Sequence, residues 1–581
     1  MSIVLLRKAA TFCCSLYFVI LLITGYWLLI MGVGMGWAYT HDASLIKWRE
    51  YTPQAFEDAK KENKPVFILI TASWCYWCHV YEENTLEDKE ISNYLNTQYI
   101  PIFVDFDKRR DIVRKYPGIG IPLTITLSPG GEKLFSVFGY LSKEELLLTL
   151  KWTLKSVSKG EMPSPQTKGE KLKGITLPNK EGLNRYISGF EKVILKGYDP
   201  VFGGFGQEEK KVFAEEMIRV AEIYKRDRDK KILEMLTNTL DHIAGLKQKP
   251  VERRRPSFEE LSKLRDKERA LIAEVEQLQK GDRIVGIFDH IEGGFFRYAT
   301  ERDWSIPHYE KTLLENADLI RLFLKAYEIT RVSKYKDIAV KSIEYVLNNL
   351  YDHKDGRFYG SQNADEVYYH FTSEERKRVK HPAIDKNSYT VSNAKMIIAL
   401  FYASDNLKDA RYKAIAKKAL NFFEREMITQ NGVLSYYDNV QKKGFLDGQL
   451  EDNAWTALAF LEAYKATKEK RLLEMAEGSV IRFAMERLYD SKGGGFFERR
   501  STSKGFYRDG ELFIDEKHPK ENSVMAYALF RAYKLTGNTD YLKKAEETIG
   551  LFMDEHMAGE ISTINPYFHR LAQALVETGR Y

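Results

Sequence analysis

Two cysteines, Cys75 and Cys78, are the residues of this chain whose type and spacing best suit chemistry. They follow an apolar, β-branched run, Pro65–Ala72, and a tryptophan, Trp74. This order is typical of a buried strand that leads into a helix, with Cys75 at or near the first turn. A helix N-terminus carries partial positive charge and free N–H groups, which stabilise a thiolate. Because Cys78 lies one turn further on, it can reach back and close a disulfide.

The same residues allow other interpretations. Cys75-Tyr76-Trp77-Cys78-His79 also matches the motif that attaches c-type haem covalently. The pair follows a β-strand instead of lying in a small helical domain, which favours dithiol chemistry over haem. A metal site is disfavoured because the chain has no second Cys-x-x-Cys. We therefore expect no cofactor and no metal, while a static disulfide or an idle feature of the fold stays open.

The N-terminal residues predict a membrane segment. Arg7 and Lys8 precede a charge-free apolar run at 9–38. This run is longer than the apolar core of about 7–15 residues in a cleaved secretory signal, and it suits a bilayer span of about 20 residues. With residues 1–8 on the cytoplasmic side, we expect a transmembrane anchor and an extracytoplasmic body, either periplasmic or at the cell surface. The alternative is cleavage after Ala38 and secretion.

The overall composition limits which partners the chain could bind and which redox chemistry it could perform. The net charge of +6 on 581 residues is mild, and Lys and Arg are interspersed with Asp and Glu, so we expect no nucleic acid partner. Of the four cysteines, Cys13 and Cys14 lie inside the apolar run. The exported part then carries only one close pair, which indicates redox chemistry or cofactor attachment and excludes a disulfide scaffold.

Residues 45–160 alternate between strands and helices, which predicts an α/β domain. The turn Ser128-Pro129-Gly130-Gly131 predicts an antiparallel hairpin at the edge of the sheet. The expected strands are Pro65–Ala72, Tyr99–Asp105, Leu123–Leu127 and Leu134–Phe138, with helices that include Pro53–Glu62 and Lys143–Ser158.

This order of elements, with Trp74 and the cysteines after the first strand and Ile-Pro before a later one, resembles the thioredoxin fold. The resemblance implies that Pro122 carries a cis peptide bond and packs beside the disulfide. It also implies that Cys75 is the nucleophile and that Cys78 is the resolving thiol. Trp74 and Pro122 would support the redox site.

After a linker at residues 161–180, the pattern changes to long amphipathic helices in pairs. Turns rich in glycine and aromatic residues separate the pairs, as in Gly293-Gly294-Phe295 and Gly494-Gly495-Phe496. About twelve helices arranged as hairpins predict a closed α/α toroid of six hairpins over residues 181–581. A charged helical insertion at 251–283 interrupts the repeat.

Polar residues gather at the predicted hairpin junctions. Carboxylates that converge at a barrel mouth could serve as general acid and base in sugar chemistry. Equally, they could cap helices and tie loops together. The residues of this possible barrel pocket are Asp289, His290, Arg297, His308, Glu310, Asp365 and Asp452.

Together these features resemble the spermatogenesis-associated thioredoxin-like family, in which a thioredoxin-like domain precedes a six-hairpin glycosidase-like α/α barrel. The resemblance covers nearly everything from Trp48 to the C-terminus. Its marks are Cys75-Tyr76-Trp77-Cys78-His79, Leu86-Glu87-Asp88, Val104-Asp105, Phe288-Asp289-His290, Gly293-Gly294-Phe295, Arg297-Tyr298 and Pro307-His308-Tyr309-Glu310-Lys311.

The sequence therefore predicts a multidomain, membrane-anchored thiol–disulfide oxidoreductase. Its dithiol would act on protein thiols or disulfides, and the barrel would bind or present the substrate. The first alternative is a carbohydrate-active enzyme, hydrolase or epimerase, that takes a small sugar-like ligand at the barrel mouth. The second is a non-catalytic binding or scaffold protein.

Overall fold

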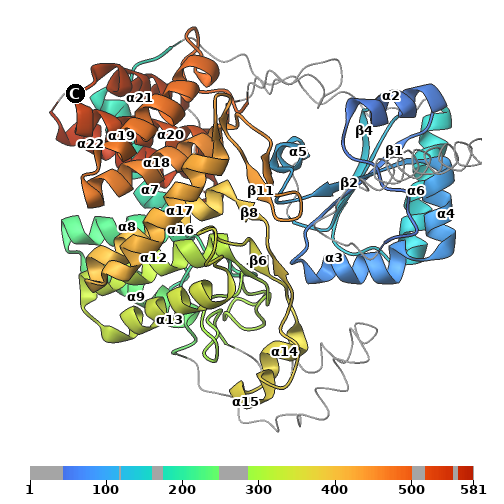
Figure 1. The fold of residues 1–581 in the computed structure, drawn as a ribbon, viewed down its shortest axis with the longest axis horizontal. Coiled ribbons are helices and arrows are strands. Elements are labelled where there is room, and N and C mark those ends of the chain that lie inside the picture. The colour runs from blue at the N-terminus through green and yellow to red at the C-terminus, as the bar shows by residue number, and fades with distance from the viewer. Residues whose placement is uncertain are drawn as a thin grey trace, which may run out of the picture.

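The computed structural model describes residues 43–116, 120–159, 175–247, 285–499, 517–553 and 560–579. Two parts are visible in Figure 1, an α/β domain and a larger helical domain. The predicted insertion at 251–283 and most of the predicted linker at 161–180 lie outside the described residues.

The α/β domain is built on a four-stranded sheet with the strand order β2-β1-β3-β4. Strand β1 pairs parallel with β2 and antiparallel with β3, and β3 and β4 form an antiparallel hairpin. The strands are β1 (Val66–Thr71), β2 (Ile100–Asp105), β3 (Leu123–Leu127) and β4 (Lys133–Phe138), and the main flanking helices are α2 (Pro53–Glu62), α3 (Tyr76–Tyr81), α4 (Lys89–Gln98) and α6 (Lys143–Lys159).

Every residue of β1 is buried because helices cover both faces of the sheet. Successive side chains of a strand point to opposite faces. Accordingly, Ile68 and Ile70 pack in the same cluster as Cys75, whereas Phe67 and Leu69 pack in the other cluster with residues of α4 and α6. The continuous apolar run in the sequence is thus a central strand.

The helical domain is a closed ring of inner helices, each paired with an outer helix. Each inner helix contacts the next, and α22 returns to α8. The described inner helices are α8 (Ala214–Asp227), α12 (Leu313–Thr330), α16 (Thr390–Leu407), α18 (Leu450–Thr467), α20 (Pro519–Thr536) and α22 (Pro566–Glu577). Their outer partners are α9 (Lys230–Ile243), α13 (Ser333–Asn349), α17 (Ala410–Phe422), α19 (Lys470–Met475), α21 (Thr539–Phe552) and α7 (Lys180–Gly197).

The burial pattern explains which helices lie inside. In α16 every residue from Thr390 to Phe401 is buried, because its neighbours in the ring and its outer partner surround it. The outer helix α13 instead buries a stripe that includes Tyr335, Ile338, Ser342 and Val346, at the spacing of one helix face.

Three of the glycine-aromatic turns tie a hairpin to the next inner helix. Asn316 of α12 accepts the N–H of Phe295 at 2.8 Å and donates to its carbonyl at 3.0 Å. The same pair of bonds joins Asn393 to Phe358 and Asn522 to Phe496. Gly294 has φ of 75°, and a Cβ there would lie 2.4 Å from the Tyr345 ring, so the turn requires glycine.

The membrane-related predictions need correction. Within the described ranges, no helix is both long and apolar enough to cross a bilayer. The 18-residue inner helix α16, for example, carries Lys395 and several polar residues and forms part of the barrel core. No described helix therefore supports the predicted N-terminal transmembrane helix of the fold class, the membrane partner or the membrane-anchored extracytoplasmic location. Residues 9–38, on which those predictions depended, lie outside the described residues.

Candidate redox site and barrel cavity

The two predicted redox cysteines form a disulfide at the start of α3. Cys75 is the N-cap residue of this helix, and its Sγ accepts the backbone N–H of Cys78 at 3.2 Å. Cys75 is 5% exposed and Cys78 is fully buried. A backbone N–H that points at sulfur favours the thiolate form once the pair is reduced. Cys75 is therefore the better placed of the two to act as the nucleophile.

The two predicted supporting residues, Trp74 and Pro122, lie beside the disulfide. The Ile121–Pro122 peptide bond is cis, and the Ile121 carbonyl oxygen lies 3.8 Å from Cys75 Sγ. Trp74 donates its indole N–H to Asp107 at 2.6 Å, and its ring meets Phe106 edge-on. These contacts fix the residue that directly precedes Cys75.

Barrel residues complete the surroundings of Trp74. The Arg297 guanidinium lies 4.3 Å from the centre of the Trp74 ring, and the Ala364 N–H approaches the Trp74 carbonyl oxygen at 3.4 Å. Arg297 in turn contacts Glu310 at 3.3 Å, and Glu310 lies 3.6 Å from His308. Three of the residues predicted for the barrel pocket, Arg297, His308 and Glu310, thus come together next to the redox site. Asp365, the neighbour of Ala364, caps the short helix α14 (Glu366–His370).

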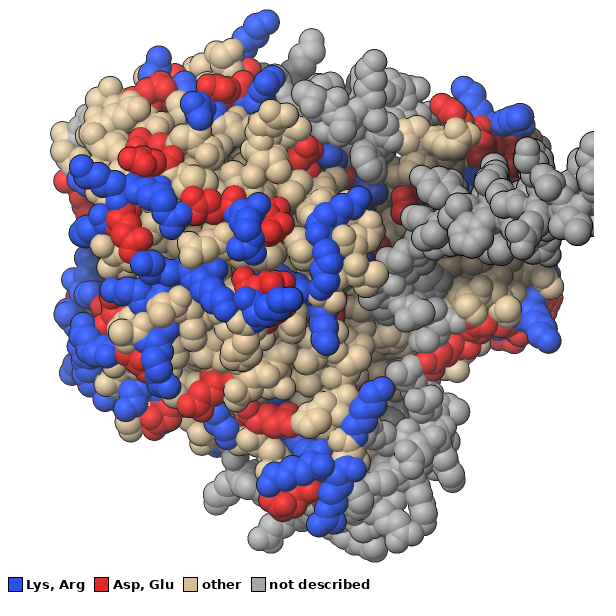
Figure 2. All heavy atoms as spheres, viewed as in Figure 1, with Lys and Arg blue, Asp and Glu red and all other residues tan. Residues whose placement is uncertain are grey.

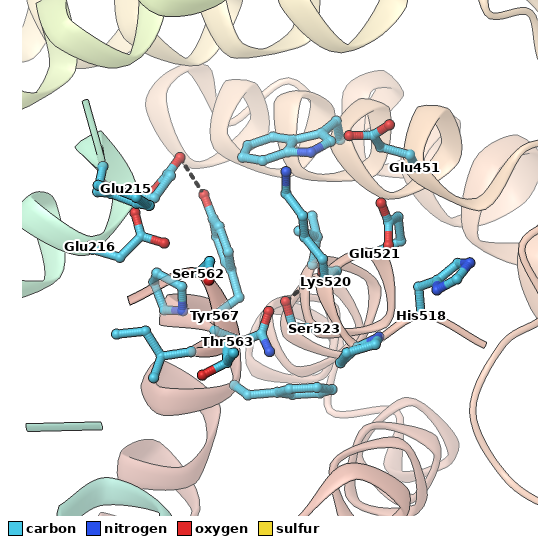
Figure 3. Close-up of a pocket in the computed structure, with 18 of the residues that line it drawn as sticks. Glu215, Glu216, Glu451, His518, Lys520, Glu521, Ser523, Ser562, Thr563 and Tyr567 are labelled. Atoms are coloured by element: carbon cyan, nitrogen blue, oxygen red, sulfur yellow. Dashed lines mark hydrogen bonds between the residues drawn. The ribbon is translucent and has the colours of Figure 1, made fainter. Parts of the chain in front are cut away.

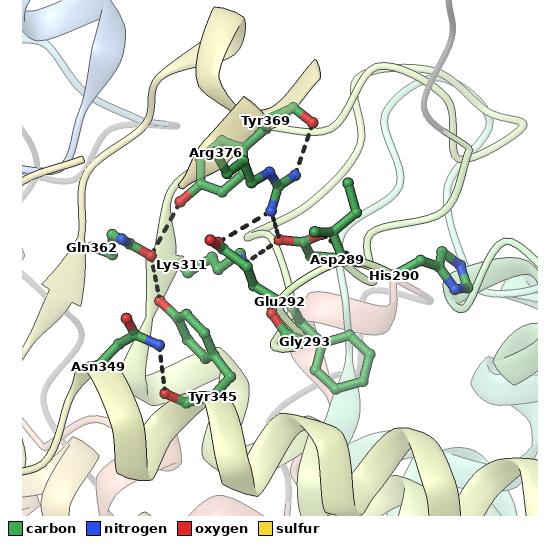
Figure 4. A network of polar contacts seen from close by, with 12 residues as sticks. Asp289, His290, Glu292, Gly293, Lys311, Tyr345, Asn349, Gln362, Tyr369 and Arg376 are labelled. Carbon is green, nitrogen blue, oxygen red and sulfur yellow. Dashed lines mark hydrogen bonds and ion pairs between the residues drawn. The ribbon is translucent and has the colours of Figure 1, made fainter. Parts of the chain in front are cut away.

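Asp289 is the centre of a buried ion network (Figure 4). Its carboxylate contacts the Lys311 ammonium and the Arg376 guanidinium, both at 2.7 Å. Burial alone raises the pKa of Asp289, but the two cations outweigh burial and hold that pKa below its ordinary value. Nearby, His290 Nε2 is hydrogen-bonded to the Ala244 carbonyl oxygen at 2.9 Å.

The same arrangement recurs at other hairpins. Lys311 Nζ also donates to the Gly293 carbonyl. Lys210 likewise joins Asp199 to the Gly203 carbonyl, and Lys517 joins Asp490 to the Gly494 carbonyl. Because Asp289 occupies a position that the repeat fills elsewhere with an equivalent ion pair, these contacts favour a loop-tying role for it.

Asp452, the last of the predicted pocket residues, lies in the first turn of α18. It is 5% exposed and accepts the Ser435 hydroxyl at 2.5 Å. Burial raises the pKa of Asp452 to about 7. It lines a small recess, together with Asp107 and Arg110 of the α/β domain, next to the contact between the domains.

We predict that Asp452→Asn stabilises the protein at alkaline pH. The folded protein keeps a proton on Asp452 up to about pH 7, whereas an unfolded chain releases it near pH 4. The free energy of unfolding therefore falls as pH rises from about 4 to about 7. Asparagine cannot ionise, so urea unfolding should give similar stabilities near pH 4.5 and a variant more stable by about 1–3 kcal/mol at pH 8. A variant less stable than the natural chain at pH 8 would contradict this.

A large cavity lies at the centre of the barrel, where the first turns of the inner helices converge (Figure 3). Its volume is about 1230 Å³. None of the seven barrel residues predicted from the sequence lines it. The charged and aromatic residues that line it from the barrel include Glu215, Glu216, Glu315, Asp318, Lys395, Glu451, Trp455, Lys520, Glu521 and Tyr567.

Two carboxyl groups of consecutive residues in the cavity have pKa values that are shifted in opposite directions. Glu215 contacts Arg321 at 2.6 Å and accepts the Tyr567 hydroxyl at 2.8 Å. Burial raises the pKa of Glu215, but Arg321, Lys395 and Arg570 outweigh it and lower that pKa. Burial raises the pKa of Glu216 to about 7. Near neutral pH the cavity therefore offers an ionised carboxylate beside a readily protonated one, as general acid–base catalysis requires.

The α/β domain forms part of the cavity wall through helix α5 (Arg110–Lys115). Figure 1 shows α5 on the side of the α/β domain that faces the barrel. Both Arg110 and Arg114 line the cavity, and Arg114 forms ion pairs with Glu451 and, at 2.9 Å, with Glu498. The domain that carries the disulfide thus also covers the barrel cavity.

Sequence reasoning missed the cavity residues, although a weak signal existed. Glu215, Glu315, Glu451 and Glu521 each occupy the second or third residue of an inner helix. Acidic residues are common in a first turn because they complement the helix dipole. An acidic residue in a first turn therefore identifies a cavity residue only once the structure shows which helices form the inner ring.

Several known proteins are similar to this chain. Residues 36–159 match the family Thioredox_DsbH, described as a protein of unknown function, DUF255. A shorter match is to the thiol:disulfide interchange protein DsbD of Campylobacter jejuni strain RM1221, with 31% identity over 99 residues, 16% of this chain and 17% of that protein.

Longer matches are to spermatogenesis-associated protein 20. The rat protein (Rattus norvegicus) is 25% identical over 355 residues, which cover 56% of this chain but only 39% of that protein. The mouse protein (Mus musculus) is 23% identical over 639 aligned positions, which cover 87% of this chain and 75% of that protein.

Among solved structures, cellobiose 2-epimerase from Spirochaeta thermophila matches 69% of this chain and 97% of its own, with a TM-score of 0.50 and 12% identity. At this identity the match concerns the fold alone. The resemblance suggested by the sequence is confirmed: a thioredoxin-like domain similar to Thioredox_DsbH is joined to a six-hairpin glycosidase-like α/α barrel, and the chain is similar over most of its length to spermatogenesis-associated protein 20.

Proposed function

We propose that this chain is a thiol–disulfide oxidoreductase in which Cys75 and Cys78 exchange electrons with a substrate and the barrel binds or presents that substrate. The observation that carries the proposal is the position of Cys75, whose Sγ caps α3 and accepts the Cys78 N–H at 3.2 Å. The similarity of this region to a thiol:disulfide interchange protein adds support. On the face shown in Figure 2, basic and acidic side chains are interspersed, which does not suggest a nucleic acid partner.

The exchange proceeds in two displacements. In the reducing direction, the Cys75 thiolate attacks a substrate disulfide, forms a mixed disulfide and releases the first substrate thiolate. The Cys78 thiolate then attacks Cys75 Sγ and displaces the second substrate thiolate. Two electrons pass to the substrate, and the Cys75–Cys78 disulfide seen in the structure is the oxidised product.

A direct test equilibrates the full chain with glutathione buffers of different ratios of oxidised to reduced form. Mass spectrometry of the alkylated peptide that contains both cysteines then gives the oxidised fraction. We expect a reversible transition between dithiol and disulfide and turnover of insulin disulfides. A pair that stays oxidised after prolonged treatment with dithiothreitol would identify a static disulfide and reject the proposal.

A second candidate, a carbohydrate-active enzyme, is favoured by the central cavity. Carboxyl groups with opposite protonation tendencies, Glu215 and Glu216, lie in the same cavity as Trp455 and Tyr567. Hydroxyl groups of a sugar could bind the carboxylates, and an aromatic ring could pack against a sugar ring. Incubation with cellobiose, followed by chromatography for an epimer or for released glucose, tests this function, with Glu216→Gln as the inactive comparison. If the sugar is unchanged and calorimetry detects no binding, cellobiose is not a substrate.

A further inference from the structure

The residue next to the disulfide lies in the contact between the two domains. Trp74, next to Cys75, is 3% exposed and is covered by Arg297 and Ala364 of the barrel. With Cys75 at 5% exposure and Cys78 at 0%, the docked arrangement leaves little room for an attacking thiolate. The barrel cannot itself be the thiol partner, because all four cysteines lie at or before position 78.

Buried ion pairs hold the domains together. Lys108 contacts Asp438 at 3.0 Å, and the Asp438 side chain is only 3% exposed. Arg114 pairs with Glu451 and with Glu498, whose side chain is 1% exposed, and lies 3.6 Å from Glu521. Because buried ion pairs depend on geometry, separation of the domains breaks them together.

The same contacts close the cavity. Arg114 lines the cavity wall, and two of its partners, Glu451 and Glu521, are cavity residues of the barrel. A movement that withdraws α5 from the barrel would therefore open the cavity and uncover the disulfide at once.

We propose that docking of the α/β domain onto the barrel acts as a single gate that closes both the disulfide and the barrel cavity. Reduction of Cys75–Cys78 then requires the same separation of the domains that opens the cavity. The proposal rests on the redox role proposed above for the cysteine pair. A reagent that reacts only with the separated form reacts at a rate set by the population of that form. Weakening a contact between the domains should therefore accelerate reduction, even where the substituted residue lies in the barrel cavity.

The test measures reduction of the natural full chain by excess dithiothreitol. Each reaction oxidises one dithiothreitol to its cyclic disulfide and passes two electrons to Cys75–Cys78, which becomes two thiols. Samples are quenched with a maleimide, and mass spectrometry of the peptide with both cysteines gives the reduced fraction. Lys108→Glu places a repelling charge beside Asp438, and Glu451→Gln removes a partner of Arg114 from the cavity side. Each should speed reduction at least about tenfold.

Two controls each lose an ion pair between partly exposed side chains inside a single domain. Lys143→Glu loses the pair with Asp88, which lies at 3.1 Å within the α/β domain. Glu462→Gln lies on α18, like Glu451, but pairs with Arg531 of the barrel itself. Both should keep the natural rate. Circular dichroism and thermal melting confirm that each variant is folded.

The outcomes separate the possible failures. Equal rates in all five proteins would overturn the gate, and so would equal acceleration in the controls. Acceleration by Lys108→Glu but not by Glu451→Gln would overturn the link to the cavity. If the gate behaves as expected but the reduced protein exchanges with no substrate disulfide, the gate stands and the proposed oxidoreductase function fails.

Discussion

Replacement of Cys75 by serine should abolish exchange with a substrate disulfide, with a loss of rate of at least about a thousandfold. A serine hydroxyl does not ionise near neutral pH, and Cys78, the remaining thiol of the pair, is fully buried in α3. Stopped-flow measurement with oxidised glutathione and the prereduced full chain would give the rates.

Replacement of Cys78 by serine is the informative counterpart. The nucleophile remains, but the resolving step is lost, so a mixed disulfide on Cys75 should accumulate and be visible by intact mass under non-reducing conditions. If Cys75→Ser accumulated the adduct instead, the roles of the two cysteines would have to be exchanged.

Replacement of Asp289 by alanine should destabilise the barrel by about 3–5 kcal/mol. The change would leave Lys311 and Arg376 buried without the carboxylate that both contact at 2.7 Å. It would also free one end of the Gly293 turn, because Lys311 joins Asp289 to the Gly293 carbonyl. Urea unfolding followed by far-UV circular dichroism measures the loss.

A surface aspartate provides the comparison. Asp337 has a 67% exposed side chain and only a 4.0 Å contact with Lys336, so Asp337→Ala should change stability by less than about 0.5 kcal/mol. An Asp289→Ala protein of natural stability that had lost a sugar-converting activity would contradict the loop-tying role and return Asp289 to the catalytic residues.

The sequence by itself determined the parts whose signals are local. A continuous apolar run followed by Trp74 and two cysteines predicts a central strand and a helix start, because burial and helix capping depend on neighbouring residues. Paired amphipathic helices with glycine-aromatic turns predict the hairpins for the same reason. The antiparallel hairpin of β3 and β4 likewise follows from its turn residues.

Only the tertiary structure decided which polar residues share a site. Arg114 and Glu451 are 337 positions apart, and no local pattern relates them. Glu215 and Glu216 face Lys395 and Tyr567 only because the ring of inner helices closes and brings their first turns to one cavity. Arg297, His308 and Glu310 were recognisable as a polar cluster, but only the docking of the domains placed them beside Trp74 and away from the cavity. Ring closure and domain docking join distant segments, so the chemistry of each cluster is set by contacts that the order of residues does not encode locally.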